Sequence, residues 1–152
     1  MDRHDVLEVS EVGERDLADL LPLMVAYCEF YGAAPGADSL LALSRTVLGD
    51  TERHGLQLLA RRGKALGFAT LYWTWSTLRA ARIAVMNDIY VVPEARGEGV
   101  GAALIEACRE RCRERGMSRL EWRTAPSNVQ AQRLYDRVGA QRSEWIDYGL
   151  DP

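Results

Sequence analysis

A glycine-rich run in the middle of the chain has the residue types and spacing of an anion-binding loop. The run is Arg96-Gly97-Glu98-Gly99-Val100-Gly101, and it lies between an apolar, strand-like segment and a long segment with helical spacing. Glycines lack the Cβ atom that would keep main-chain N–H groups away from a ligand. The helix expected to begin near Gly99 adds unpaired N–H groups and the positive end of its dipole. The run therefore predicts a cradle for a phosphate group of an anionic cofactor.

The same glycines leave a second interpretation open. Gly97, Gly99 and Ala102 also fit the dinucleotide fingerprint GxGxx(G/A). Glu121 lies at a plausible distance downstream for the acidic residue of that fingerprint. In a dinucleotide-binding fold, however, the first glycine closes its strand directly, near the start of a repeated βαβ array. Residues 93–96 intervene here, so a dinucleotide-dependent oxidoreductase is the less favoured interpretation.

Two motifs in order resemble one enzyme family. Val91-Val92-Pro93 and the glycine run after it resemble the acyl-CoA signature of the GCN5-related N-acetyltransferase (GNAT) family. Asn128, Ala131 and Leu134-Tyr135, followed by Gly139-Ala140, are similar to the second cofactor motif of that family. Together the motifs make acetyl-CoA the cofactor that the resemblance implies.

The resemblance covers about residues 56–150 well and the helical N-terminal part more loosely. It implies an α+β, GNAT-like fold, in which a central mixed, mostly antiparallel sheet is flanked by about four helices. Two strands of this fold splay apart to form the acetyl-CoA site. The activity that it implies is direct transfer of an acetyl group to an amine in a ternary complex, without a metal or a covalent acyl-enzyme. The family's cofactor contacts correspond to Ile89, Tyr90, Val91, Arg96, Gly97, Glu98, Gly99, Val100, Gly101, Ala102, Asn128 and Ala131.

The candidate catalytic residues are Tyr135, Asp88 and Asn87. Tyr135 matches the tyrosine with which this family commonly protonates the departing thiolate. Many members have a glutamate base where this chain has Asn87, and an amide cannot usefully accept a proton. Asp88 is adjacent, but on an undistorted strand it points to the opposite face, so it is a candidate only if the strand bulges or the acceptor lies on its side. A structural carboxylate is the competing role for Asp88, and the missing glutamate also leaves open a non-catalytic acyl-CoA-binding module.

Aromatic side chains and one acid mark the expected acceptor site. The candidate substrate-binding residues lie at the end of the first helix and on a hairpin strand: Tyr27, Glu29, Tyr31, Trp73 and Trp75. Aromatic rings and a carboxylate can together hold an ammonium group. Strand alternation sends Trp73 and Trp75 to one face and Tyr72 to the other, so core packing is the competing role for the tryptophans.

Residues 87–91 and 134–136 most resemble the polyamine and diamine acetyltransferase branch, which favours a small-molecule amine as acceptor. Branches that act on aminoglycosides or protein amines share the cofactor half and remain alternatives. A homodimer is expected from the family, with Trp145 as a candidate interface residue.

Alternating elements must position these residues. The spacing of apolar residues, together with helix-capping and turn residues, predicts the strands and helices. The expected strands span residues 6–9, 56–60, 65–77, 82–92, 119–124 and 145–150, and the expected helices span residues 14–30, 38–49, 100–115 and 128–138. The strand over residues 82–92 delivers the chain to the glycine run, with the splay expected near Ile89 to Val91.

Composition and charge narrow the class of protein. The 152 residues, 47% hydrophobic and 27% charged, fit a single domain over residues 1–152, which the resemblance implies is an N-acetyltransferase domain. A net charge of -3 argues against a nucleic-acid partner. No apolar run approaches the roughly 20 residues that span a bilayer, and residues 1–10 are too charged for a signal peptide, so a cytoplasmic protein without a membrane partner is expected. Cys28, Cys108 and Cys112 suit a reducing compartment, and the last two fit a helix core rather than a metal pair.

Overall fold

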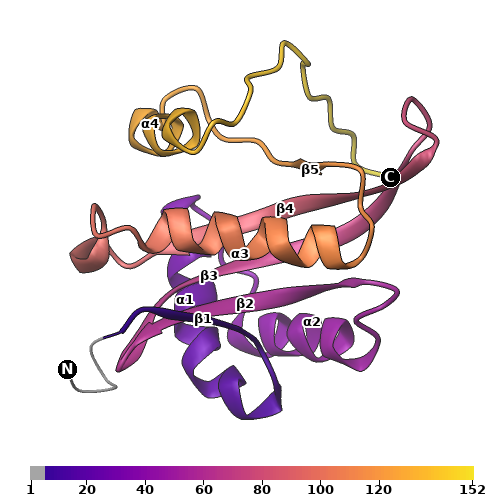
Figure 1. Cartoon of the computed structure of the whole chain (residues 1–152). Helices are drawn as coiled ribbons and strands as arrows, with labels where there is room; N and C mark the ends of the chain where they lie inside the picture. Colours follow the sequence, from indigo (N-terminus) through magenta and orange to yellow (C-terminus); the bar gives the residue numbers. More distant parts are fainter. Residues whose placement is uncertain (1–5) are drawn as a thin grey trace.

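The computed structural model describes residues 6–152 as a five-stranded sheet with helices on both faces (Figure 1). The strands follow the order β1-β2-β3-β4-β5, with three antiparallel pairs and a parallel pair of β4 with β5. Their bounds are β1 Glu8–Glu11, β2 Gly55–Arg62, β3 Lys64–Ser76, β4 Ala81–Val91 and β5 Leu120–Glu121. The predicted α+β fold with a mixed, mostly antiparallel sheet is therefore confirmed.

Two helices cover each face of the sheet. Helices α1 (Leu17–Phe30) and α2 (Ala37–Gly49) lie on one face, where Leu59 and Phe68 of the sheet join their apolar side chains. Helices α3 (Val100–Glu114) and α4 (Val129–Arg137) lie on the other, where the core contains the apolar side chains of the opposite alternation (Figure 1). Short 3-10 turns, η2 (Glu14–Asp16) and η3 (Pro93–Ala95), precede α1 and the glycine run. Among residues 6–152, no helix combines the length and the apolar character needed to cross a membrane.

A β-bulge interrupts β4 next to its centre. Thr70 of β3 opposes Asp88, and Leu71 opposes Met86, so Asn87 is the extra residue of the bulge. An extra residue reverses the alternation of side chains on the strand. Met86 lies in the α3 core cluster, whereas Asp88, two residues later, lines a cavity that α1 and α2 also line. The bulge thus turns Asp88 toward the opposite face of the sheet from Met86.

The strands β4 and β5 separate soon after they meet. They pair only at Ala84 with Leu120 and at Val85 with Glu121. From Met86 to Val91, the edge of β4 on this side has no strand partner among the described residues. This lack of a strand partner agrees with the splay expected near Ile89 to Val91.

The prediction of a terminal strand over residues 145–150 is wrong, and β5 is shorter than the expected residues 119–124. Residues 141–152 carry no regular secondary structure and make no backbone hydrogen bond within the described part of the chain. Apolar residues with strand propensity form a strand only where a neighbouring strand offers hydrogen-bonding groups. Among the described residues, this segment pairs with no strand, although the Arg123–Asp147 ion pair at 3.0 Å brings it close to the residues after β5.

Candidate active site

The glycine run forms an open turn before α3. Gly97 has φ +81° and Gly99 has φ +83°, a left-handed region that strains other residues. A Cβ atom at either position would meet nothing within 4 Å, so the space above the turn is free. Gly99 is the N-cap of α3, and the first N–H groups of a helix have no intrahelical acceptor. This geometry fits a phosphate group at the start of α3.

Two residues of the run, Glu98 and Gly101, contact other parts of the protein. A Cβ atom on Gly101 would lie 2.7 Å from Leu134 Cδ2, so this glycine allows α4 to pack closely on α3. Glu98 pairs with Arg62 at 2.8 Å, across the start of α3. The run therefore offers a ligand its main-chain groups, while Gly101 and Glu98 also have structural roles.

Arg96 lies between the glycine run and the aromatic end of α1. Its Nε donates to the carbonyl oxygen of Val91 at 3.0 Å. Its guanidinium lies over the rings of Phe30 and Tyr90, 5.8 Å and 5.7 Å from their centroids. Arg96 therefore connects the last residue of β4 to α1. Its hydrogen bond also satisfies the Val91 carbonyl oxygen, which has no strand partner.

Helix α4 brings Tyr135 and Asn128 to the same side of the sheet as the splay. The side chain of Asn128 caps α4 by accepting from the main-chain N–H of Ala131 at 3.2 Å. The ring of Tyr135 packs edge-on against Trp122, with 5.3 Å between ring centroids. Burial, with a smaller effect of nearby Tyr31, raises the pKa of Tyr135 to about 12. The phenol therefore keeps its proton at neutral pH.

A cavity of about 160 Å³ lies between α1, α2 and the sheet. Its walls are mostly apolar or aromatic, and they contain one carboxylate. The lining residues are Met24, Tyr27, Cys28, Leu40, Leu43, Phe68, Tyr72, Asn87 and Asp88. A carboxylate in such a wall can hold an ammonium group strongly, because little water screens the charges.

Asp88 is the carboxylate of this cavity, and its side chain is only 8% exposed. Burial raises the pKa of Asp88, while hydrogen bonds from Thr70, Tyr27 and Asn87 act in the lowering direction. Asn87 Nδ2 donates to Asp88 Oδ1 at 2.9 Å, and the Tyr27 hydroxyl lies 3.3 Å from the Asn87 carbonyl oxygen. The strand bulges here, which is the condition under which the sequence made Asp88 a candidate base.

Two polar residues behind Asp88 were not identified from the sequence. Gln57 Nε2 donates to Thr70 Oγ1 at 3.2 Å, and Thr70 stands opposite Asp88 in the strand register. Gln57 and Thr70 are 3% and 0% exposed. A donor bond from Gln57 leaves the Thr70 hydroxyl proton free to point at the carboxylate. The available signal was that Gln57 and Thr70 each interrupt a run of apolar residues, within residues 56–60 and 65–71.

The candidate acceptor residues from α1 lie at or near the cavity. Tyr27 lines it, and the ring of Tyr31 lies 5.0 Å from that of Tyr27. Glu29 is exposed on the same turn of the helix. Burial and the neighbouring Asp88 raise the pKa of Tyr27, and the same two causes raise the pKa of Cys28. Both groups are therefore neutral donors at physiological pH.

The structure does not bring the two candidate tryptophans of β3 to the cavity. Trp73 is buried in the α3 core, where its Nε1 donates to the Thr51 carbonyl oxygen at 2.8 Å. Trp75 is 73% exposed near the end of β3. Tyr72, of the opposite alternation, lines the cavity, and burial together with Asp88 raises its pKa to about 12.

Comparison with known proteins gives concordant matches. The model of the acetyltransferase (GNAT) family matches residues 21–140. The uncharacterized N-acetyltransferase YhfO of Bacillus subtilis is 31% identical over 146 residues, covering 95% of this chain and 97% of that protein. The thialysine N-epsilon-acetyltransferase of Bos taurus is 36% identical over 76 residues, which are 50% of this chain and 44% of that protein. The aminoglycoside N-acetyltransferase AAC(6')-Iy, solved in complex with CoA, has the same fold with a TM-score of 0.84 at 19% identity, covering 99% of this chain and 98% of that one.

Proposed function

Because this chain belongs to the GNAT family of acetyltransferases, we propose that it moves an acetyl group from acetyl-CoA directly to the primary amine of a small molecule, with a polyamine or diamine favoured. The observation that carries this proposal is the arrangement of β4. Its bulge presents Asp88 to the cavity on one face, while its free edge, from Met86 to Val91, leads to the glycine cradle. An acceptor site and a cofactor site therefore meet at one strand.

The cofactor side fits acetyl-CoA by its chemistry. Main-chain N–H groups of residues 97–101 would hold the pyrophosphate, because Gly97 and Gly99 leave open space above them. The free edge of β4 at Ile89 to Val91 would pair with the amides of the pantetheine arm, as an added strand does. Acetyl-CoA supplies the activated thioester. A bound CoA in the AAC(6')-Iy structure supports the assignment.

Two side chains would act as the general base and the general acid of the reaction. An alkyl amine has a reference pKa near 10.4, so it must lose a proton before it can attack. Asp88, which is hydrogen-bonded at the cavity wall, would accept that proton in its carboxylate form. Tyr135, which keeps its proton because its pKa is raised to about 12, would donate to the leaving sulfur. Asn87 would donate a hydrogen bond to the Asp88 carboxylate and would not accept the proton of the amine.

The cavity favours a slender amine. Its volume of about 160 Å³ is close to that of cavities that hold one benzene ring, so one aliphatic arm fits inside it and a multi-ring aminoglycoside does not. One buried carboxylate matches one ammonium group. The rings of Tyr27, Phe68 and Tyr72 can add cation–π attraction. The match to a thialysine acetyltransferase supports an acceptor of this shape.

A homodimer and a cytoplasmic location complete the proposal. The three cysteines are free thiols in this structure, and two of them are buried in the α3 core. Free thiols suit a reducing compartment. Trp145, which is 83% exposed, is the candidate residue of the dimer interface.

The test is release of free CoA thiol from acetyl-CoA with a panel of acceptors: diamines, polyamines, thialysine, aminoglycosides, amino acids and basic peptides. We expect the highest kcat/KM with a linear diamine or polyamine, because one arm fits the cavity. Higher activity with aminoglycosides or peptides would contradict the proposed acceptor class but would still agree with an acetyltransferase. Absence of thiol release with every acceptor, from protein that binds acetyl-CoA, would contradict the proposal.

A further inference from the structure

Three polar side chains form a row across the sheet, on the face that α1 and α2 cover. Gln57 of β2 stands opposite Thr70 of β3, and Thr70 stands opposite Asp88 of β4. All three are buried. Val12, whose N–H donates to the Gln57 main-chain carbonyl oxygen, ends the row on the far side of β2 with a buried apolar side chain. The row therefore reaches the acceptor cavity at Asp88.

The hydrogen bonds of this row run in one direction. Gln57 Nε2 donates to Thr70 Oγ1 at 3.2 Å, so the Thr70 hydroxyl places its own proton on another acceptor. Asp88 is that acceptor, and the hydrogen bond from Thr70 acts to lower the pKa of the Asp88 carboxyl. An ionised carboxylate only accepts hydrogen bonds, whereas a protonated one also needs an acceptor for its proton. The direction of the row therefore favours the ionised form of Asp88.

This direction leaves the oxygen of the Gln57 amide group unsatisfied. Gln57 Oε1 is buried and has no hydrogen-bond partner among residues 6–152. A buried acceptor without a donor costs free energy. An amide group turned by about 180° would present Oε1 to the Thr70 hydroxyl and gain that hydrogen bond, but it would take the Thr70 proton away from Asp88. The observed orientation therefore requires a neighbouring group that holds the amide.

The sulfur atom of Met24 on α1 is placed to hold the amide. Gln57 Nε2 lies 3.8 Å from Met24 Sδ, and Ser44 Oγ donates to the same sulfur at 3.3 Å. A thioether sulfur is a weak acceptor of hydrogen bonds and donates none. A turned amide would bring Oε1, a second acceptor, against this sulfur. Because both contacts are buried, little water can relieve the repulsion between the two acceptors.

We propose that Gln57 is a positioning residue for the general base, and that the Met24 sulfur holds its amide group so that the Thr70 hydroxyl proton stays directed at Asp88. Gln57 is not among the residues that line the acceptor cavity, so it acts on the base only through Thr70. Met24 lines the cavity and joins its wall to the row behind it. This inference rests on the proposed function, because it takes Asp88 as the base.

The other titratable groups around Asp88 do not interfere with this effect. Tyr27 and Cys28 face Asp88 from α1, and Tyr72 faces it from β3. Burial, together with the nearby charge of Asp88, raises the pKa of all three groups, so they stay neutral while Asp88 titrates. Helix α2 adds only apolar side chains to the lining of the cavity. A change at Gln57 can therefore be measured on Asp88 itself.

The test measures the pKa of Asp88 in the ligand-free protein, from the NMR signal of its carboxyl carbon, and separately the acidic limb of kcat/KM. Gln57→Met keeps a side chain of similar length without an amide. It should raise the pKa of Asp88, by less than Thr70→Val does, because the Thr70 hydroxyl remains but is no longer directed. Met24→Leu changes the volume little, and it should also raise the pKa of Asp88, because the freed amide turns its oxygen toward Thr70.

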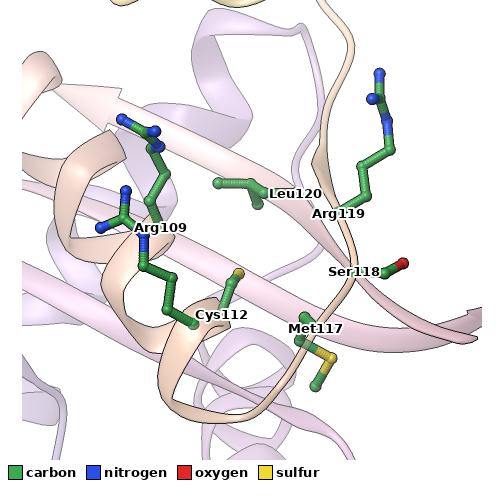
Figure 2. Close-up of a pocket in the computed structure, with 7 residues that line it drawn as sticks. Arg109, Cys112, Met117, Ser118, Arg119 and Leu120 are labelled. Carbon is green, nitrogen blue, oxygen red and sulfur yellow. The ribbon is translucent and has the colours of Figure 1, made fainter.

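Met117→Leu is the matched control for the sulfur. Met117 lines a cavity of about 150 Å³ between α3 and β5 and packs against the core on the α3 side of the sheet (Figure 2). The same chemical change is made there without touching the row behind Asp88. The pKa of Asp88 and the acidic limb of kcat/KM should therefore keep their wild-type values in this variant.

A double variant shows whether Gln57 acts through Thr70. Gln57→Met added to Thr70→Val should not raise the pKa of Asp88 further, and an additional rise as large as that in the wild-type background would overturn the proposal. An unchanged pKa of Asp88 in Gln57→Met or in Met24→Leu would overturn it as well. If the pKa moves as expected but the acidic limb of kcat/KM does not follow it, Asp88 is not the base; that result contradicts the proposed function and supports the positioning of Asp88 by Gln57.

Discussion

The cofactor side and the acceptor side of β4 are built from different kinds of groups. The cofactor side consists mainly of main-chain atoms, namely the free edge after Val85 and the turn at Gly97 and Gly99. The acceptor side consists of side chains from α1, α2, β3 and β4 around Asp88. A backbone site depends on local conformation, whereas a side-chain site depends on how distant elements pack. Changes to Asp88 and its neighbours should therefore affect proton transfer, and changes to the glycine turn should affect cofactor affinity.

The largest expected effect is on the acceptor side. Asp88→Asn should lower kcat/KM by roughly 10³-fold, because a positioned base typically contributes about 10²–10⁴-fold. Acetyl-CoA affinity, measured by calorimetry, should not change. Glu110→Gln is the control, since Glu110 is an exposed carboxylate on α3, away from the acceptor cavity, and this variant should keep nearly full activity. Equal losses in the two variants would remove Asp88 from the role of base.

Asp88→Asn, which should lower activity, should not lower the stability of the folded state. Burial raises the pKa of Asp88 in the folded state above its value in the unfolded chain. Between the pKa of Asp88 in the unfolded chain and its higher pKa in the folded state, the folded state binds more protons than the unfolded chain. The free energy of unfolding therefore falls as the pH rises from the lower to the higher of these pKa values. Asp88→Asn removes this charge, and its Tm at pH 7 should equal or exceed that of the wild type. A clear fall in Tm would indicate a structural role for the carboxylate.

The next effect tests the proton donor of α4. Tyr135→Phe should lower kcat by roughly 10²-fold, with little change in the KM for acetyl-CoA, because only the proton for the leaving sulfur is lost. Tyr148→Phe makes the same chemical change on an exposed ring and should leave kcat unchanged. The readout is steady-state thiol release, and an unchanged kcat in Tyr135→Phe would exclude the tyrosine as the acid.

A smaller effect is expected from the cofactor turn. Gly99→Ala should weaken acetyl-CoA binding roughly tenfold, or about 1.4 kcal/mol, because a Cβ atom enters the space above the cradle. Gly116→Ala is the matched control, since Gly116 also has positive φ and open space around it but lies at the other end of α3. Both variants should lose similar thermal stability, and only Gly99→Ala should lose affinity in calorimetry.

The smallest effect is a shift of the pH profile. Thr70→Val removes a hydrogen bond to the Asp88 carboxylate, so the pKa of Asp88 should rise further. The acidic limb of kcat/KM should then move to higher pH, while activity on its basic side changes little. Thr70→Ser should restore the wild-type limb. A loss of activity that is equal at every pH would show that Thr70 acts only through packing.

The outcome for individual elements shows where sequence reasoning succeeds. Strand β3 and helix α3 occur close to their predicted bounds, because each has a strong periodicity and a glycine or a cap at its ends. The prediction of a terminal strand is wrong, because residues 145–150 have the right residue types but pair with no strand in the described residues. On β3, the sequence separated the tryptophans from Tyr72 by alternation, and packing against α1 decided that Tyr72 meets the cavity.

The resemblance to the family, the helices and the glycine turn could be recognised from the sequence, since they depend on local residue types and their spacing. The face of the sheet on which Asp88 lies depends on tertiary contacts, because a one-residue bulge at Asn87 reverses the alternation and no local pattern specifies it. The tertiary structure likewise decided that Gln57 and Thr70 stand behind Asp88, and that the C-terminal segment remains unpaired. Strand register and long-range packing set these features, and both arise from contacts between residues that are far apart in the chain.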